Sequence, residues 1–142
     1  MAKLDPLIRM RKHLVEQKQK FLADLYRQAE ELQAKKKSLH DELEFERKAV
    51  NDINSVEAVI YFGRYSEVIK GRIEDIGEAI IKLDVRIEVA REDIRTAFAD
   101  LKKIEITQER REDAEEKERN KKESSTLDDI AIDGFRRNQD EN

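Results

Sequence analysis

The sequence of 142 residues contains no cysteine and no tryptophan, one proline and four glycines. The lack of cysteine excludes a disulfide framework and metal or redox sites built on thiolates. There is no secretory signal and no apolar run that could span a bilayer, so we expect a cytoplasmic protein without direct membrane insertion. Aromatic residues make up 6% and charged residues 44%, which leaves enough apolar material for one narrow seam but not for a thick globular core.

Motifs for nucleotide binding and for zinc-dependent catalysis are also missing. The sequence has no Gly-rich phosphate-binding loop and no His-Glu-x-x-His pair. The two histidines, His13 and His40, are far apart and have no cysteine partners, so we expect no metal site and no cofactor. The many carboxylates should lie on solvated helix faces, and a single seam offers no concave pocket. We therefore expect a protein that is not an enzyme.

Two ladders of mostly apolar residues, at alternating spacings of three and four, run through the chain. An average period of 3.5 residues is typical of the seam of a left-handed coiled coil. Eleven of fifteen positions are apolar in the first ladder and thirteen of fourteen in the second. The first ladder consists of Leu4, Ile8, Arg11, Val15, Lys18, Leu22, Leu25, Ala29, Leu32, Lys36, Leu39, Leu43, Glu46, Val50 and Ile53. The second consists of Val59, Phe62, Ser66, Ile69, Ile73, Ile76, Ile80, Leu83, Ile87, Ala90, Ile94, Ala97, Leu101 and Ile104.

The ladders have nearly equal length, and a short polar gap separates them. Asn51, Asp52, Asn54 and Ser55 lie in this gap, and such side chains favour turns and helix caps. A short linker holds two helices at roughly millimolar effective concentration, so pairing within one chain should win over a parallel dimer. We predict an all-α fold: a long antiparallel two-helix coiled-coil hairpin with a C-terminal helical overhang. It should be a monomer at least about 75 Å long, from about 50 residues per arm at a rise of about 1.5 Å.

We expect one coiled-coil domain over residues 1–142. Asp5 should be the N-cap of the first helix with Pro6 in its first helical position, and Ser55 should cap the second helix. Ser124–Thr126 should loosen the second helix, and Gly134 is a stop signal beyond it. The expected segments are a first helix over about residues 5–51, a turn over about 52–58, a second helix over about 59–123 and a flexible amphipathic tail over 124–142.

Charge is unevenly distributed, although the net charge of −4 is modest and argues against general nucleic-acid binding. Residues 1–40 hold ten Lys or Arg and five Asp or Glu, a local net charge of +5, so the rest of the chain carries −9. Arg9, Arg11 and Lys12 make the start of the hairpin basic, and Arg11 occupies a ladder position where burying a charge is costly. These three residues are candidates for contact with an acidic partner; the alternative is a solvated face.

Three aromatic residues and a valine should share one exposed flank near the turn. In the heptad register of the ladders, Phe45, Tyr61 and Val68 take position c and Tyr65 takes position g. These positions of both helices lie on the same flank of an antiparallel pair, and Phe45 should lie across from Tyr65. Exposed clusters of this kind mark interaction sites more often than scattered apolar residues do. The alternative is that the aromatic residues pack the turn.

Several segments taken together resemble one family of helical proteins. The start Leu4–Arg11 leads into a long helix, and the tyrosine-rich segment Tyr61–Ile69 opens the second helix. The charged run Glu109–Glu123 leads to the segment Leu127-Asp128-Asp129-Ile130-Ala131. With the helical hairpin, these features resemble the FliJ family of bacterial flagellar type III export over most of the chain. The last segment is similar to the family's terminal Leu/Met-Asp-Glu element, which makes Leu127, Asp128 and Ile130 candidates for a tail interaction.

The resemblance implies a small cytoplasmic stalk, similar to the central stalk of rotary ATPases, at the flagellar base and peripherally associated with the inner membrane. Its paired termini would enter the flagellar export ATPase ring, with Arg9, Arg11 and Lys12 as the ATPase-binding residues. Its flank would contact the cytoplasmic domain of the export gate. The gate-binding residues would be Phe45, Tyr61, Tyr65 and Val68. Family members also bind and recycle export substrate chaperones.

Two other classes stay open from the sequence. One is a prefoldin-like holdase, which is also built on helical hairpins but needs strand segments between the helices. The other is a generic coiled-coil scaffold, as in the peripheral stalk of a rotary ATPase.

Overall fold

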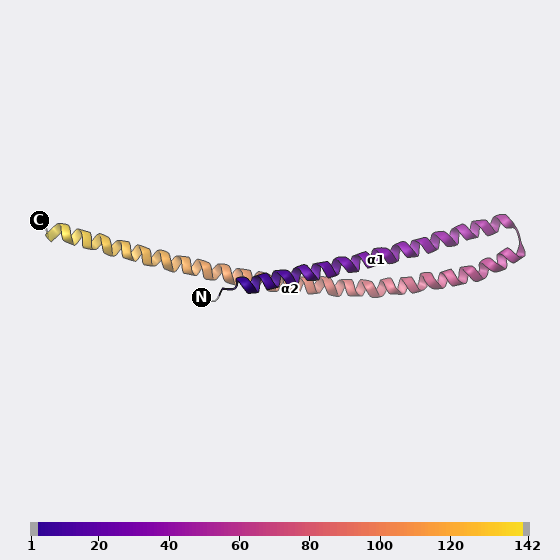
Figure 1. The fold of residues 1–142 in the computed structure, drawn as a ribbon, viewed down its shortest axis with the longest axis horizontal. Coiled ribbons are helices and arrows are strands. Elements are labelled where there is room, and N and C mark those ends of the chain that lie inside the picture. Colours follow the sequence, from indigo (N-terminus) through magenta and orange to yellow (C-terminus); the bar gives the residue numbers. More distant parts are fainter. Residues whose placement is uncertain (1–2, 141–142) are drawn as a thin grey trace. The chain divides into compact units, whose positions relative to one another are not determined.

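The computed structural model describes residues 3–140. These residues form two long helices, α1 over Asp5–Ile53 and α2 over Val56–Asp140, which are joined by Asn54 and Ser55 (Figure 1). No strand occurs in the described range. The two helices pack against each other as a hairpin, which confirms the predicted fold class.

The start of α1 differs by one residue from the prediction. The carbonyl of Leu4 accepts a hydrogen bond of 2.9 Å from the backbone N–H of Ile8, so Leu4 takes the cap position and Asp5 is the first helical residue. The prediction that Asp5 is the N-cap was therefore wrong. Its carboxylate still lies in the first turn, where the helix dipole favours a negative charge. Pro6 also remains in the first turn, where its missing N–H costs no helical bond.

The chain reversal is shorter than the predicted turn over residues 52–58. Asn54 has φ = 53°, in the left-handed region that asparagine tolerates better than most residues, and this one residue redirects the chain. Ser55 caps α2, as predicted. Its Oγ accepts a hydrogen bond of 3.5 Å from the N–H of Ala58, and its carbonyl accepts one of 3.2 Å from the N–H of Val59. A left-handed residue followed by a cap is enough for the reversal, so the predicted turn was too long.

Helix α2 continues through the segment that was predicted to be a separate tail. The hydroxyl of Thr126 donates a hydrogen bond of 2.9 Å to the carbonyl of Lys122 inside the helix, and Gly134 is helical too. The predicted end of the helix near residue 123 was therefore wrong. Every side chain from residue 116 to residue 140 is exposed. The flexibility expected of residues 124–142 stays a prediction. The last two residues of this segment lie outside the described range.

The chain forms two compact units, residues 13–97 and residues 1–12 together with 98–142. In residues 13–97, the core is a single seam in which Leu25 of α1, 0% exposed, packs against Leu83, Ile87 and Ala90 of α2. All buried side chains of this unit lie on the two ladders of the sequence. The others are Val15, Val50, Ser66, Ile69, Ile80 and Ala97. The 3.5-residue period therefore located the core of this unit.

The two ladder residues nearest the turn are not part of the core. Ile53 is 62% exposed and Val59 is 59% exposed. An opening of about 220 Å³ separates the two helix ends there, with Val50, Val56 and Val59 among its lining residues. The prediction that Ile53 and Val59 belong to the seam was wrong, because the helix ends do not close on each other at the turn.

In the unit formed by residues 1–12 and 98–142, the first turns of α1 pair with the middle of α2. Leu101 is the buried residue of this contact. Four apolar residues around it are half-buried: Leu4, Leu7, Ile8 and Ile104. Beyond Gln108, side chains of the described range are exposed except for the half-buried Glu115. This exposed part of α2 is the predicted helical overhang.

Candidate functional site

The predicted aromatic flank lies in residues 13–97, close to the turn. Tyr61 and Tyr65 are one helical turn apart on α2, and their rings stack with centroids 6.2 Å apart and planes inclined by 13°. The hydroxyl of Tyr65 donates a hydrogen bond to the carboxylate of Glu42 on α1, so these sides of the two helices form one flank. Phe45 follows Glu42 by three residues and Val68 follows Tyr65 by three residues. At this spacing, both side chains lie on the same flank.

Three of the four flank residues are open to solvent. Phe45 is 71% exposed, Tyr61 is 64% exposed and Val68 is 56% exposed, whereas Tyr65 is half-buried. The hydrogen bond to Glu42 raises the pKa of Tyr65 to about 12, and desolvation and the nearby charges of Glu42 and Glu46 act in the same direction. Tyr65 is therefore held neutral and fixed between the helices, and the other three side chains are available to a partner.

An apolar patch at the turn was missed by sequence reasoning. This tip patch contains side chains that are all more than half exposed. They are Ile53 (62%), Val56 (77%), Val59 (59%) and Ile60 (55%). Val56 and Ile60 are four residues apart and lie off the ladder, and this spacing was the signal that could have found them. The tip patch directly precedes Tyr61 in the sequence.

The basic start of α1 is not made of three equivalent residues. Arg9 and Lys12 are exposed, as a binding role requires. Arg11 is half-buried at its ladder position, and its guanidinium lies 3.9 Å from the carboxylate of Asp100 on α2. Its Nε is buried without a hydrogen-bond partner among the described residues. Arg9 and Lys12 are thus the two exposed residues of the three, and the side chain of Arg11 is 35% exposed beside Asp100. A binding role for Arg11 stays a prediction.

The three predicted tail residues lie on the overhang of α2. Leu127 is 65% exposed, Ile130 is 62% exposed, and Asp128 between them is exposed as well. None of the three makes an ion pair or a side-chain hydrogen bond within the described range. The tail is thus a helical surface without a covering element in its own unit.

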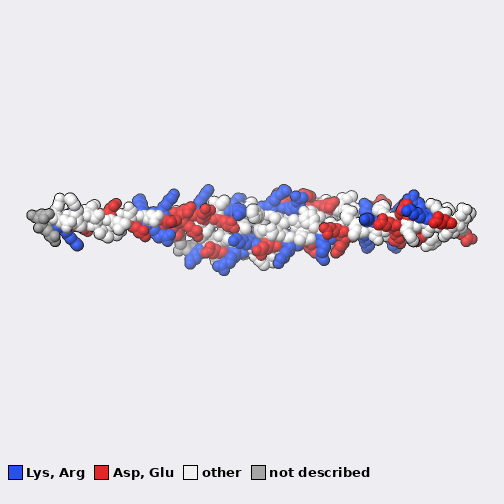
Figure 2. All heavy atoms as spheres, turned by 90° about the horizontal axis from the view of Figure 1, so that it is seen from above, with Lys and Arg blue, Asp and Glu red and all other residues white. Residues whose placement is uncertain are grey.

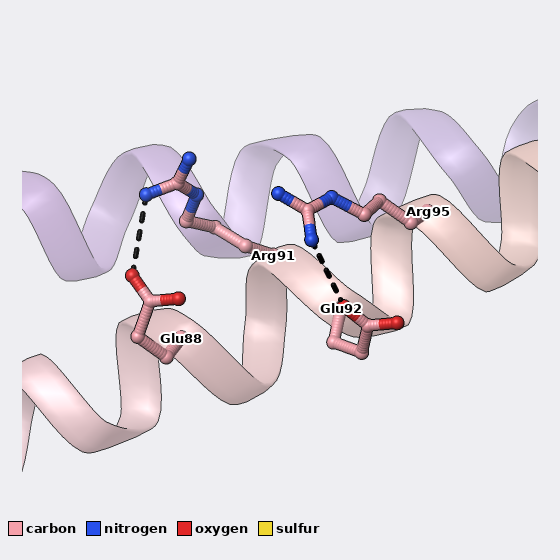
Figure 3. A network of polar contacts seen from close by, with 4 residues as sticks. All are labelled: Glu88, Arg91, Glu92 and Arg95. Carbon is pink, nitrogen blue, oxygen red and sulfur yellow. Dashed lines mark hydrogen bonds and ion pairs between the residues drawn. The ribbon is translucent and has the colours of Figure 1, made fainter.

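Charged side chains are frequent on the remaining surface of the described residues. Both signs of charge are interspersed along the molecule (Figure 2). Glu88 pairs with Arg91 at 3.2 Å and Glu92 pairs with Arg95 at 3.1 Å, each within one turn of α2 (Figure 3). Exposed pairs of this kind stabilise a protein by only about 0–1 kcal/mol. Residues 3–140 contain no group of three or more potential metal ligands. No helix in the same range combines the length and the apolar character needed to cross a membrane.

The grooves along residues 13–97 are open and shallow. One groove, of about 430 Å³, lies beside Gly77, where α2 lacks a side chain opposite Gln33 and Lys36 of α1. Its floor is apolar through Ile73 and Ile80.

Comparison with known proteins agrees with the resemblance seen in the sequence. No curated protein and no solved structure matches this chain. A family profile described as flagellar FliJ protein matches residues 1–140, which include both helices, the turn, the aromatic flank and the tail. The chain therefore belongs to the FliJ family of flagellar proteins.

Proposed function

We propose that this protein is a non-enzymatic stalk of the flagellar export apparatus, which links the export ATPase ring to the cytoplasmic domain of the export gate and escorts substrate chaperones. Membership of the FliJ family makes it a protein associated with flagellar export. The observation that carries the finer proposal is the exposed aromatic flank near the turn, where Phe45 is 71% and Tyr61 is 64% exposed. We place the function of the protein in exposed surfaces of this kind.

We assign gate binding to the flank of Phe45, Tyr61, Tyr65 and Val68, together with the tip patch. Aromatic side chains dominate binding energy at protein interfaces, and Phe45 and Tyr61 expose most of their surface. Tyr65 contributes by position, because its bond to Glu42 fixes the stack with Tyr61. The contact should therefore be mainly apolar and weakly dependent on salt.

Calorimetric titration of the gate's cytoplasmic domain tests this assignment. Phe45→Ala with Tyr61→Ala should weaken binding at least about tenfold, because both side chains would be buried by the partner. The matched control is Ile81→Ala with Val85→Ala, which removes apolar side chains that are 66% and 61% exposed elsewhere on α2. Both double variants should keep their helicity. Equal affinities for the two variants would remove the flank from the interface.

We assign ATPase binding to the basic start of α1, through Arg9 and Lys12. Charge-assisted contacts raise association rates and weaken as ionic strength rises, which suits a stalk that moves between subunits of a ring. Arg9→Glu with Lys12→Glu should reduce ATPase stimulation at low salt and leave gate binding intact. Arg11 is not changed in this test, because it lies beside Asp100 in the helix pair.

The control for charge is Lys35→Glu with Lys37→Glu, the same reversal at two exposed residues farther along α1. Stimulation by the wild-type protein should itself fall as salt is raised. If the variant at Arg9 and Lys12 stimulates the ATPase normally at every salt concentration, the basic start is only a solvated face.

The holdase alternative is less well supported than the stalk. A prefoldin-like protein needs strand segments between its helices, and here Asn54 and Ser55 alone connect α1 to α2. A direct assay is suppression of aggregation of an unfolded test protein. The stalk proposal expects no suppression at equimolar concentration, and it expects export chaperones to be captured from solution.

A further inference from the structure

The overhang of α2 contains two segments of opposite helix-forming character. From Glu109 to Glu123, thirteen of fifteen residues are strong helix formers. From Ser124 to Phe135, only Leu127 and Ala131 among twelve residues belong to that class. Asp129 and Asp133 also place like charges four residues apart, which destabilises a helix. The sequence of the second segment therefore gives the helix little support.

The structure adds no support from packing. Every side chain of residues 124–135 is exposed, and the segment makes no ion pair within the described range. Its one side-chain hydrogen bond joins Thr126 to the carbonyl of Lys122. The segment continues the helix of residues 109–123 and needs no nucleus of its own, but its helix propensity is low and helix ends fray. A stable helix over residues 124–135 therefore depends on contacts with a partner surface.

Apolar side chains of this segment nevertheless gather on one side of the helix. We call them the tail stripe: Leu127, Ile130, Ala131 and Phe135. Consecutive members are three, one and four residues apart, which places them on one amphipathic face, and the three large members are 62–65% exposed. In Figure 2 most atoms near the C-terminal end of the helix are neither acidic nor basic. Residues 124–135 carry three Asp and no Lys or Arg, a net charge of −3, with Asp128 and Asp133 beside the stripe.

We propose that residues 124–135 fold on docking, and that the tail stripe enters an apolar groove with a basic rim on the export ATPase. An amphipathic helix of about three turns that lays one face into a groove is a recurring mode of recognition. The charge of −3 requires Lys or Arg at the rim of such a groove. The inference rests on the proposed function, which brings the termini of the chain to the ATPase. The helix described for this segment is then its docked form.

Binding of full-length variants to the export ATPase tests the docking face. Ile130→Ser should weaken binding at least about tenfold. The matched control is Ile132→Ser, the same change at a residue that is 52% exposed but lies off the tail stripe, beyond Asp128. The control should bind within about twofold of the wild type. Equal affinities for the two variants would show that the tail stripe is not the contact face.

Charge and helix content give two further readouts. Asp128→Asn with Asp133→Asn should weaken binding and reduce its dependence on salt. Ser125 lies on the side of the helix opposite the tail stripe, so Ser125→Ala raises helix propensity without touching the contact. A segment that folds on docking should then bind about two- to threefold more tightly. Unchanged affinity of Ser125→Ala would argue that the helix is already formed before docking.

Hydrogen exchange at short labelling times measures the folding step directly. In the free protein, amides of residues 124–135 should exchange faster than those of residues 109–123, and saturating ATPase should protect them. Equal protection of the two segments in the free protein would overturn folding on docking. If the ATPase binds wild type and Ile130→Ser alike, this inference fails and the proposed function stands. If the wild-type protein does not bind the ATPase at all, both fail.

Discussion

Replacing Leu25 with alanine removes the one large side chain that is fully buried among residues 3–140. Leu25 is 0% exposed and packs against Leu83, Ile87 and Ala90 across the seam. Truncating a fully buried leucine costs about 2–5 kcal/mol, and the loss depends on how far the site collapses. A seam one layer thick can close partly over the cavity, and alanine is a slightly better helix former. We therefore expect a loss of about 3 kcal/mol.

Urea unfolding followed by circular dichroism at the helical band measures this loss as a lower midpoint at unchanged slope. Leu127→Ala is the matched control, because the same atoms are removed from a side chain that is 65% exposed. Its free energy of unfolding should change by less than about 0.5 kcal/mol. Similar losses for the two variants, or a loss below about 1 kcal/mol for Leu25→Ala, would show that the seam does not run through Leu25.

Three further predictions follow from local geometry. The pKa of Tyr65 is about 12 in the folded protein and its ordinary value is 10, so the stabilisation linked to its hydrogen bond is complete below pH 10 and is lost as pH rises through about 12. Ultraviolet titration should show one late tyrosine that moves toward 10 in Glu42→Gln; no late tyrosine would contradict the bond. Asn54→Val should cost about 1–2 kcal/mol in thermal unfolding because of the left-handed backbone, whereas Asn54→Gly should not. Gly71→Ala should stabilise by about 0.5–1 kcal/mol, because Gly71 is helical and an added Cβ meets nothing within 4 Å; destabilisation would reveal an unseen constraint.

The sequence predicted the core of the fold well because the seam has a strict period. Buried residues from Val15 to Leu101 fall on ladder positions, and even the polar Ser66 was located by its place in the ladder. Positions of helix ends were less predictable, since a cluster of Asn and Ser marks a turn without fixing its length. The reversal combines the left-handed φ of Asn54 with the cap formed by Ser55.

The candidate surfaces were predicted less completely. The heptad register predicted Tyr65 across from Phe45, whereas the hydroxyl of Tyr65 donates its hydrogen bond to Glu42, three residues earlier on α1. The ladder showed that Arg11 is a charged residue at a seam position. Its approach to Asp100 could not be predicted, because that requires the relative register of the two helices. The tip patch was missed because Ile53 and Val59 fit the ladder, and periodicity says nothing about where the two helices separate.

Signals can pass along coiled coils when one helix slides against the other, and the turn of this hairpin bears on that possibility. The seam would tolerate a shift of one heptad, about 10 Å, because the apolar pattern repeats. Such a shift would have to lengthen the connection, yet Asn54 and Ser55 alone span it. It would also break the bond between Tyr65 and Glu42, the one side-chain hydrogen bond between α1 and α2 in the described residues. We therefore expect a signal carried by residues 13–97 to travel as bending or rotation of the paired helices together, rather than as axial displacement of one helix.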